Sequence, residues 1–301
     1  MTPFHLLLCL LVSASAYSKG LREKNCKHGA CSAQWEEKEG RERVLGALNK
    51  ENLAFLSDVK ASLFSSTNNF TSKYEYSNGN TGDYLQTIQT TVESLGDSRY
   101  KGTSTYIVQI EGTYGEPYAQ ASHLSITSDY TFGGDFIFWQ QVGEGTFYLK
   151  DDKGQYYEAG NITATGSGYC RTTSETASMT MMENTQVIDL GKYSSVSKSV
   201  SSTTSEVGSN GLKVSGTETT TTQTGSYSSL VASLLTETTP YPMQDGPYEV
   251  EATGSMQDPS GLASMKSTGS GYVSYSKESF DVKEWINYYT ALSFRNFRHV
   301  F

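Results

Sequence analysis

One stretch of the chain recurs without a gap 142 positions further on, and this recurrence constrains the fold more than any other feature. Residues 106–138 match residues 248–280 at ten of 33 positions. The identical pairs are Tyr106 with Tyr248, Val108 with Val250, Gly112 with Gly254, Pro117 with Pro259, Ala121 with Ala263, Ser122 with Ser264, Ser125 with Ser267, Ser128 with Ser270, Tyr130 with Tyr272 and Phe138 with Phe280. The recurrence is either a tandem duplication or a chance likeness between two Ser/Gly/Tyr-rich strand regions, and we adopt duplication as the hypothesis.

Each copy is expected to begin with a helix. Tyr84, Ile88, Val92 and Leu95 lie at three- and four-residue spacing, and residues 227–235 of the second copy show a similar apolar stripe. Antiparallel strands are expected to follow at residues 105–112, 119–127, 135–142, 146–150 and 155–159, separated by turns such as residues 143–145 and 151–154. The most strongly indicated local structure is the hairpin of residues 147–158.

The N-terminal part differs in character from the rest. Residues 1–16 combine an apolar run with Ala14-Ser15-Ala16, which predicts a signal peptide. Residues 17–66 hold nine Lys or Arg against seven Asp or Glu, with apolar residues at helical spacing. This charged helical segment either packs on the first repeat, which we favour, or lies on a membrane or partner.

The fold class predicted from these patterns is α+β and β-rich. It consists of two tandem units, each a helix followed by an antiparallel sheet, preceded by an amphipathic helical segment. The first unit is expected at residues 67–193 and the second, shorter unit at residues 225–301. Residues 194–224 form a Ser/Thr-rich connection between them, which is either a flexible O-glycosylated linker or a set of polar strands.

The chain carries no recognisable catalytic or metal-binding motif. It lacks a Gly-x-Ser-x-Gly elbow, a His-Glu-x-x-His helix and a phosphate-binding glycine loop, and His28, His123 and His299 are scattered. We therefore predict that it is not an enzyme and has no catalytic residues, metal site or cofactor. The formal net charge of −9 disfavours nucleic acid as a partner.

Cysteines and glycosylation sequons fit passage through an oxidising compartment. Cys26 and Cys31 are close enough in sequence to form a disulfide, which leaves Cys170 either buried or linked to a second chain in a disulfide-bonded dimer. Asn69 and Asn161 each begin an Asn-x-Thr sequon, so both are expected N-glycosylation sites. After the signal peptide no run of about 18 apolar residues follows, so we expect no membrane span and a secreted, extracellular protein.

In composition the region after about Thr67 resembles the secreted organic-matrix proteins of animal skeletons and shells, since it is acidic, repetitive and rich in Ser, Thr, Gly and Tyr. The resemblance implies a secreted acidic glycoprotein with a structural or extracellular-matrix role, whose partners are other matrix proteins or a mineral surface. The alternative function is an extracellular carrier of an apolar ligand or lipid. Its helix-on-sheet pocket would be lined by Tyr130, Phe136, Phe138, Trp139 and Tyr148.

Overall fold

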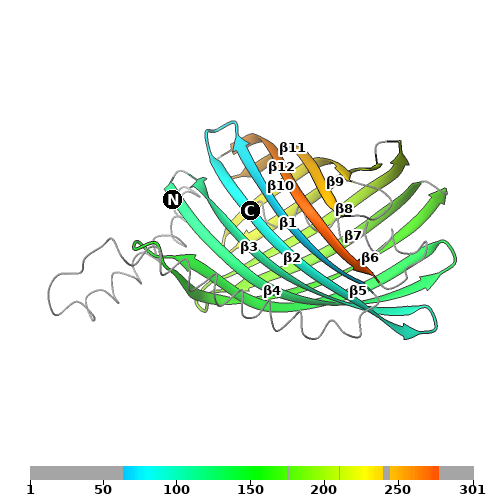
Figure 1. Cartoon of the computed structure of the whole chain (residues 1–301). Coiled ribbons are helices and arrows are strands. Elements are labelled where there is room, and N and C mark those ends of the chain that lie inside the picture. Colours follow the sequence, from blue (N-terminus) through cyan, green and yellow to red (C-terminus); the bar gives the residue numbers. More distant parts are fainter. Residues whose placement is uncertain are drawn as a thin grey trace.

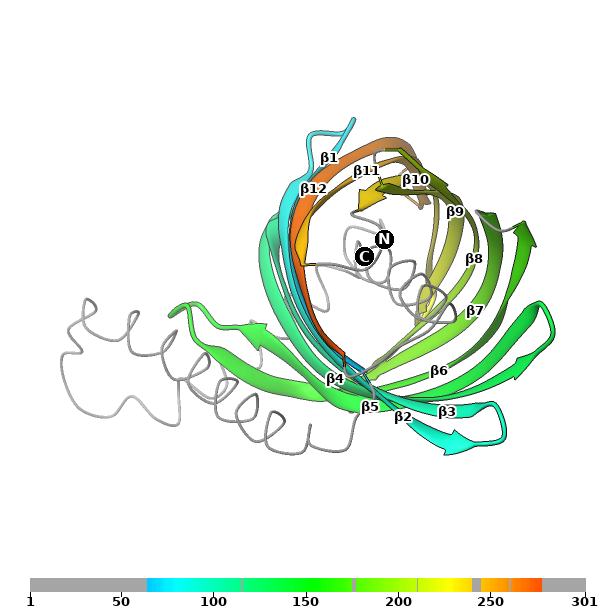
Figure 2. The same cartoon turned by 45° about the vertical axis from the view of Figure 1, so that its right-hand side comes forward.

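The structure is a closed antiparallel β-barrel. The computed structural model describes residues 64–114, 116–174, 177–209, 211–239, 245–259 and 261–277, and every regular element in these ranges is a strand. The strands are β1 (Phe64–Tyr76), β2 (Thr81–Gly96), β3 (Arg99–Tyr114), β4 (Glu116–Gly133), β5 (Phe136–Lys150), β6 (Tyr156–Ser174), β7 (Ala177–Asp189), β8 (Ser194–Gly208), β9 (Gly211–Thr224), β10 (Tyr227–Thr239), β11 (Gly246–Asp258) and β12 (Gly261–Lys277). Each pairs with its neighbours in sequence, and β1 pairs with β12 to complete the ring seen in Figures 1 and 2.

The predicted α+β fold of two helix-and-sheet units is therefore wrong. The stripe of Tyr84, Ile88 and Val92, expected on a helix, lies on one face of strand β2, and all three side chains are buried. A four-residue spacing is also a multiple of two, so it places side chains on one face of a strand as well as on one side of a helix. The β-branched residues between them favour the strand.

The second expected helix, at residues 227–235, is strand β10. Tyr227 and Val231 are buried on the inner face, whereas Leu230 and Leu234 face outward and are exposed. What looked like one apolar helical stripe thus consists of two sets of side chains on opposite faces. The signal peptide at 1–16 and nearly all of the charged segment at 17–66 lie outside the described residues.

The recurrent stretches do not form equivalent units. Residues 106–138 contribute to β3, β4 and β5, and the described part of residues 248–280 forms β11 and β12. Pro117 lies within β4, but its match Pro259 lies in the turn between β11 and β12. Tyr130 pairs with the buried Trp139, whereas its match Tyr272 is 51% exposed. Both stretches belong to one barrel, so the tandem-unit architecture was wrong.

Alternation of burial defines an inner and an outer face on every strand. On β1 the inner positions Phe64, Asn68 and Phe70 are buried, while the intervening positions face outward. Exposed outward residues of β1 and of other strands include Lys73, Asp83, Glu183, Lys198 and Glu251. The Ser/Thr-rich residues 194–224 follow the same rule as β8 and β9, with buried Ser201, Thr203 and Ser205 on the inner face.

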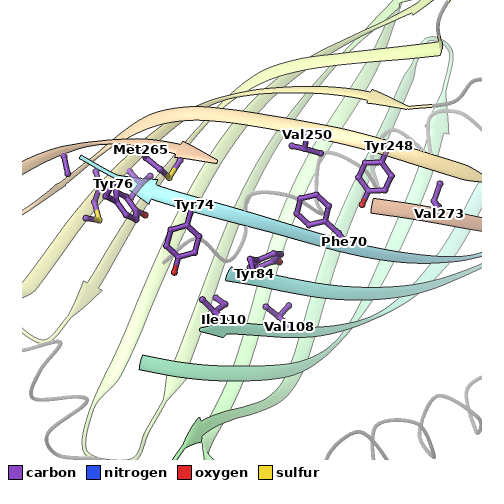
Figure 3. Packing of buried hydrophobic residues seen from close by; sticks show 13 residues of the cluster. Phe70, Tyr74, Tyr76, Tyr84, Val108, Ile110, Tyr248, Val250, Met265 and Val273 are labelled. Atoms are coloured by element: carbon purple, nitrogen blue, oxygen red, sulfur yellow. The ribbon is translucent and has the colours of Figure 1, made fainter. Parts of the chain in front are cut away.

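The seam at which the barrel closes is packed around a glycine. Gly271 of β12 stands opposite Phe70 of β1 and Tyr248 of β11, whose rings stack with centroids 5.9 Å apart and an interplanar angle of 6°. A Cβ atom at Gly271 would collide with the Tyr248 ring. The Tyr248 hydroxyl donates a 2.7 Å hydrogen bond to Oδ1 of Asn68. Figure 3 shows Phe70 and Tyr248 near each other within this cluster.

The expected turn at residues 143–145 is wrong, because these residues lie inside strand β5. A Cβ at Gly145 would collide with the backbone carbonyl of His123 on β4, so this glycine permits close contact between strands.

The hairpin of residues 147–158 is confirmed: Lys150 pairs with Tyr156. Its turn is held by Oδ1 of Asp151, which accepts hydrogen bonds from the amides of Lys153 and Gln155 at 2.9 and 2.8 Å.

Candidate functional site

The five residues predicted to line one apolar pocket are divided between the two faces of the barrel. Tyr130 and Trp139 belong to the inner face, and Trp139 is 2% exposed. Phe136, Phe138 and Tyr148 point outward, because they alternate with Trp139 and the buried Phe147 along β5. Phe136 and Phe138 stack on the outer surface with ring centroids 5.7 Å apart. The structure therefore does not form the expected pocket.

Clusters of buried side chains occupy the inner face at different heights of the barrel. One of them, called here the Trp139 cluster, joins residues of β1, β2, β5, β6, β7 and β9, namely Phe64, Val92, Ile137, Trp139, Cys170, Met182, Leu212 and Val214. A second cluster contains Tyr74, whose hydroxyl is hydrogen-bonded to that of Tyr118. A cavity between β3–β6 and β7–β9 has a volume of only about 50 Å³. That volume accommodates a few water molecules and not a six-membered ring.

A much larger hollow lies on the outer face, across β11, β12, β1, β2 and β3. Its volume is about 750 Å³, within the range of ligand-binding sites. The strand register arranges its side chains in two rows. Glu249, Ser270, Thr71, Leu85 and Gln109 form the first row, and Glu251, Thr268, Lys73, Asp83 and Glu111 form the second. These strands are neighbours in Figure 1. We call this surface the outer hollow.

Two of the four carboxylates in the outer hollow are paired with lysines. Asp83 lies 3.5 Å from the Lys73 ammonium, and Glu111 lies 3.0 Å from the Lys150 ammonium. Glu111 also accepts a hydrogen bond of 3.2 Å from the Tyr156 hydroxyl. Glu249 and Glu251 are exposed, and no ion pair to them exists among the described residues. Within the described part of the chain, the β11 side of the hollow therefore presents two carboxylates that no lysine or arginine neutralises.

Hydroxyl, amide and aromatic groups complete the outer hollow. Thr71, Ser270 and Thr268 supply hydroxyl groups that both donate and accept, and Gln109 supplies an amide. At one edge the next outward row contains Tyr272 and Asn69, which stand opposite each other on β12 and β1. Tyr272 is 51% exposed, so its ring is available to a ligand that extends beyond the hollow. The site thus combines polar groups with an aromatic edge.

The predicted cysteine and glycosylation sites have different outcomes. Cys26 and Cys31 lie outside the described residues. Cys170 is 1% exposed within the Trp139 cluster, and burial raises the pKa of its thiol. Of the two alternatives for Cys170, the structure agrees with the buried thiol and not with a disulfide to a second chain. Asn69 and Asn161 face outward from β1 and β6 with exposed side chains, and their glycosylation stays a prediction.

The residues of the outer hollow were not predicted, although the alternation Tyr-Glu-Val-Glu at 248–251 indicates two carboxylates on one strand face.

The described part of the chain contains neither a metal-binding cluster nor a helical membrane span. No group of three or more His, Cys, Asp or Glu residues there is arranged to hold a metal ion. No helix within the described ranges is both long and apolar enough to cross a bilayer.

Comparison with known proteins identifies similar folds. No protein-family model matches the chain, and no curated protein matches it. A solved outer membrane channel from Pseudomonas putida F1 is similar with a TM-score of 0.52 at 9% identity, over 72% of this chain and 98% of that one. A solved structure of the CymD monoaromatic hydrocarbon channel gives a TM-score of 0.42 at 6% identity, over 74% of this chain and 91% of that one. The first similarity supports the barrel fold.

These findings correct the expectations drawn from composition. The resemblance to organic-matrix proteins is wrong, because the chain folds as a closed barrel similar to a channel protein. The matrix role and the matrix and mineral partners implied by this resemblance are not retained. The secreted, extracellular localisation expected from the signal peptide and the lack of an apolar run is not retained either. The helix-on-sheet carrier is overturned by the same fold. The expectation of no membrane span considered apolar helices alone, and barrels cross membranes with strands.

Proposed function

We propose that the protein binds oligosaccharides in the outer hollow, with a preference for sugars that carry amino groups. The observation that carries this proposal is a pair of carboxylates, Glu249 and Glu251, that form no ion pair with any residue the structure describes, in an open hollow of about 750 Å³. The hollow is long enough to contact several linked sugar rings, because it crosses five strands spaced about 4.8 Å apart.

The chemistry of the lining matches a ligand that is rich in hydroxyl groups. Ionised carboxylates accept hydrogen bonds from two neighbouring hydroxyls, and Thr71, Thr268 and Ser270 donate or accept as the sugar requires. Leu85, which is 44% exposed, offers an apolar surface to the less polar face of a sugar ring. Tyr272 extends this surface at the edge of the hollow.

The charge of the hollow selects among sugars. An ammonium group about 4 Å from one carboxylate gains about 1 kcal/mol even at the dielectric constant of water, and a carboxylated sugar is repelled by a similar amount. Two glutamates act on the same ligand, so the difference between cationic and anionic oligomers is larger. Salt should weaken the preference, because the site is exposed.

Isothermal titration calorimetry with three oligomers of matched length tests this function. Glucosamine oligomers should bind most tightly, N-acetylglucosamine oligomers more weakly, and galacturonate oligomers weakest. Combined Glu249→Gln and Glu251→Gln should weaken binding of the glucosamine oligomer about tenfold, or about 1.4 kcal/mol. The matched control is Glu183→Gln with Glu206→Gln, which removes two outward carboxylates from β7 and β8 and should leave Kd unchanged. Equal affinities of the wild type for the three oligomers, together with an unchanged Kd in the Glu249→Gln and Glu251→Gln variant, would overturn the proposal.

A second candidate function, passage of small molecules across a membrane, is favoured by the strand lengths. The strands have 13 to 19 residues, more than the about 9–11 needed to cross a bilayer. Against it, insertion would turn Lys198 and Glu183 toward lipid, and each Lys near the midplane costs about 2–4 kcal/mol. This function requires that purified protein float with liposomes in a density gradient and conduct ions in a planar bilayer. If the protein neither floats with liposomes nor conducts ions, the transport function is excluded.

A further inference from the structure

The Asn69 sequon adjoins the outer hollow. Asn69 and Thr71 lie two residues apart on the outer face of β1, which separates them by about 6.7 Å, and Thr71 lines the hollow. The Asn69 side chain is exposed, and its Oδ1 accepts a 2.9 Å hydrogen bond from the Thr87 hydroxyl, which leaves its amide nitrogen directed away from that bond. Attachment of a glycan at this nitrogen therefore requires no change in the barrel.

The surroundings of Asn69 favour a glycan that lies along the wall. Tyr272 stands directly opposite Asn69 on β12, and Ser270 stands opposite Thr71. A sugar linked to Asn69 thus has an exposed aromatic ring beside it, and the nearest hydroxyl groups of the hollow lie two residues, about 6.7 Å, further along the strands. The second sequon differs, because Asn161 lies on β6, opposite Thr146 and Asp189, and contributes nothing to the hollow.

We propose that an N-glycan on Asn69 occupies the outer hollow and thereby controls access of external oligosaccharides to it. The inference rests on the proposed function of the hollow, since the same hydroxyl, amide and carboxylate groups would contact the attached sugars. Removal of the glycan, or its trimming to a single sugar, opens the site. The Asn69 sequon is then a regulatory element of the binding site, whereas the Asn161 sequon is not.

Tethering makes this competition effective even for a weak sugar site. A ligand held by a short flexible connection has an effective concentration in the millimolar range. If the attached glycan binds the hollow with a dissociation constant about tenfold below that concentration, it reduces the apparent affinity for external sugar about tenfold. An external cationic oligomer displaces the attached glycan only because the oligomer is attracted more strongly to Glu249 and Glu251.

The test uses the full chain produced in cells that perform N-glycosylation. Mass spectrometry of glycopeptides first establishes occupancy of Asn69 and Asn161. Affinity for the glucosamine oligomer is then measured for the wild type, for Asn69→Gln, for Asn161→Gln, and for wild type trimmed by an endoglycosidase. We expect Asn69→Gln and the trimmed protein to bind about tenfold more tightly than the wild type, and Asn161→Gln to bind like the wild type.

The outcomes separate this inference from the function on which it rests. An unmodified Asn69, or an Asn69→Gln protein that binds with wild-type affinity, overturns the regulatory role and leaves oligosaccharide binding in place. Equal gains in affinity for the glucosamine oligomer in Asn69→Gln and Asn161→Gln also overturn the regulatory role of Asn69, because a general effect of glycans would then explain the result. Failure of every form to bind the oligomer overturns the proposed function itself, and the inference falls with it.

Discussion

Replacement of Trp139 by alanine is expected to lower the free energy of unfolding by about 3–5 kcal/mol. Trp139 is 2% exposed and packs within the Trp139 cluster, where its ring covers Gly168 so closely that a Cβ atom there would collide with it. Its removal leaves a cavity among side chains drawn from distant strands, which the rigid barrel fills poorly. Urea denaturation followed by far-UV circular dichroism measures the change.

Gln140→Ala is the matched control for this prediction. Gln140 is the next residue of β5, faces outward and is exposed, so its truncation should change the free energy of unfolding by no more than about 0.5 kcal/mol. If Trp139→Ala and Gln140→Ala have similar effects, the assignment of inner and outer faces on β5 is incorrect.

Gly271→Val should lower the free energy of unfolding by about 1–3 kcal/mol or more, because it disturbs the packing where β12 closes the barrel. The added side chain would occupy the space of the Tyr248 ring, which stacks on Phe70 and donates a hydrogen bond to Asn68 and so cannot turn aside without losing both contacts. Thermal and urea denaturation give the magnitude. The outward Ser274→Val on the same strand is the control and should be close to neutral.

A double variant distinguishes a steric effect from a backbone effect at this position. Tyr248→Ala vacates the space that the introduced valine side chain would need, so Gly271→Val combined with Tyr248→Ala should destabilise less than the sum of the two single changes. Strict additivity would mean that Gly271 is required for its backbone conformation, and the packing described at the seam would not account for it.

The sequence predicts those parts of the fold that depend on neighbours in the chain. The hairpin of residues 147–158 was recognisable because its turn residues, Asp151 and Gly154, lie between the aromatic pairs Phe147-Tyr148 and Tyr156-Tyr157. Strand content was indicated by the many Thr and Tyr residues. Residues 1–63 lie outside the described residues, so the predictions for the signal peptide and for nearly all of the charged segment stay untested.

Errors arose where one pattern fits two structures. Tyr84, Ile88 and Val92 satisfy both a helical stripe and one face of a strand, and the buried Gln86 and Thr90 between them are polar residues that obscure the two-residue period. Glycine was similarly ambiguous, since Gly143 and Gly145 indicated a turn and instead allow β5 to approach β4.

Neither the closure of the barrel nor the outer hollow could be predicted, because both depend on contacts between distant parts of the chain. Thr71 meets Ser270 only through the pairing of β1 with β12, and these two residues are 199 positions apart in the sequence. No local signal in the sequence joins these strands. Glu249 and Glu251 were visible as carboxylates on one strand face, but their position in a hollow follows only from the ring of strands around them.

Amide chemical-shift mapping of the deuterated, ¹⁵N-labelled, unglycosylated protein during titration with a glucosamine oligomer shows directly whether the outer hollow binds the sugar. We predict that the largest shifts fall on β11, β12, β1 and β2 around Glu249, Thr268 and Thr71, and that they vanish in the variant combining Glu249→Gln and Glu251→Gln. Shifts concentrated on inner-face residues around Trp139, or no shifts at saturating oligomer, would contradict it.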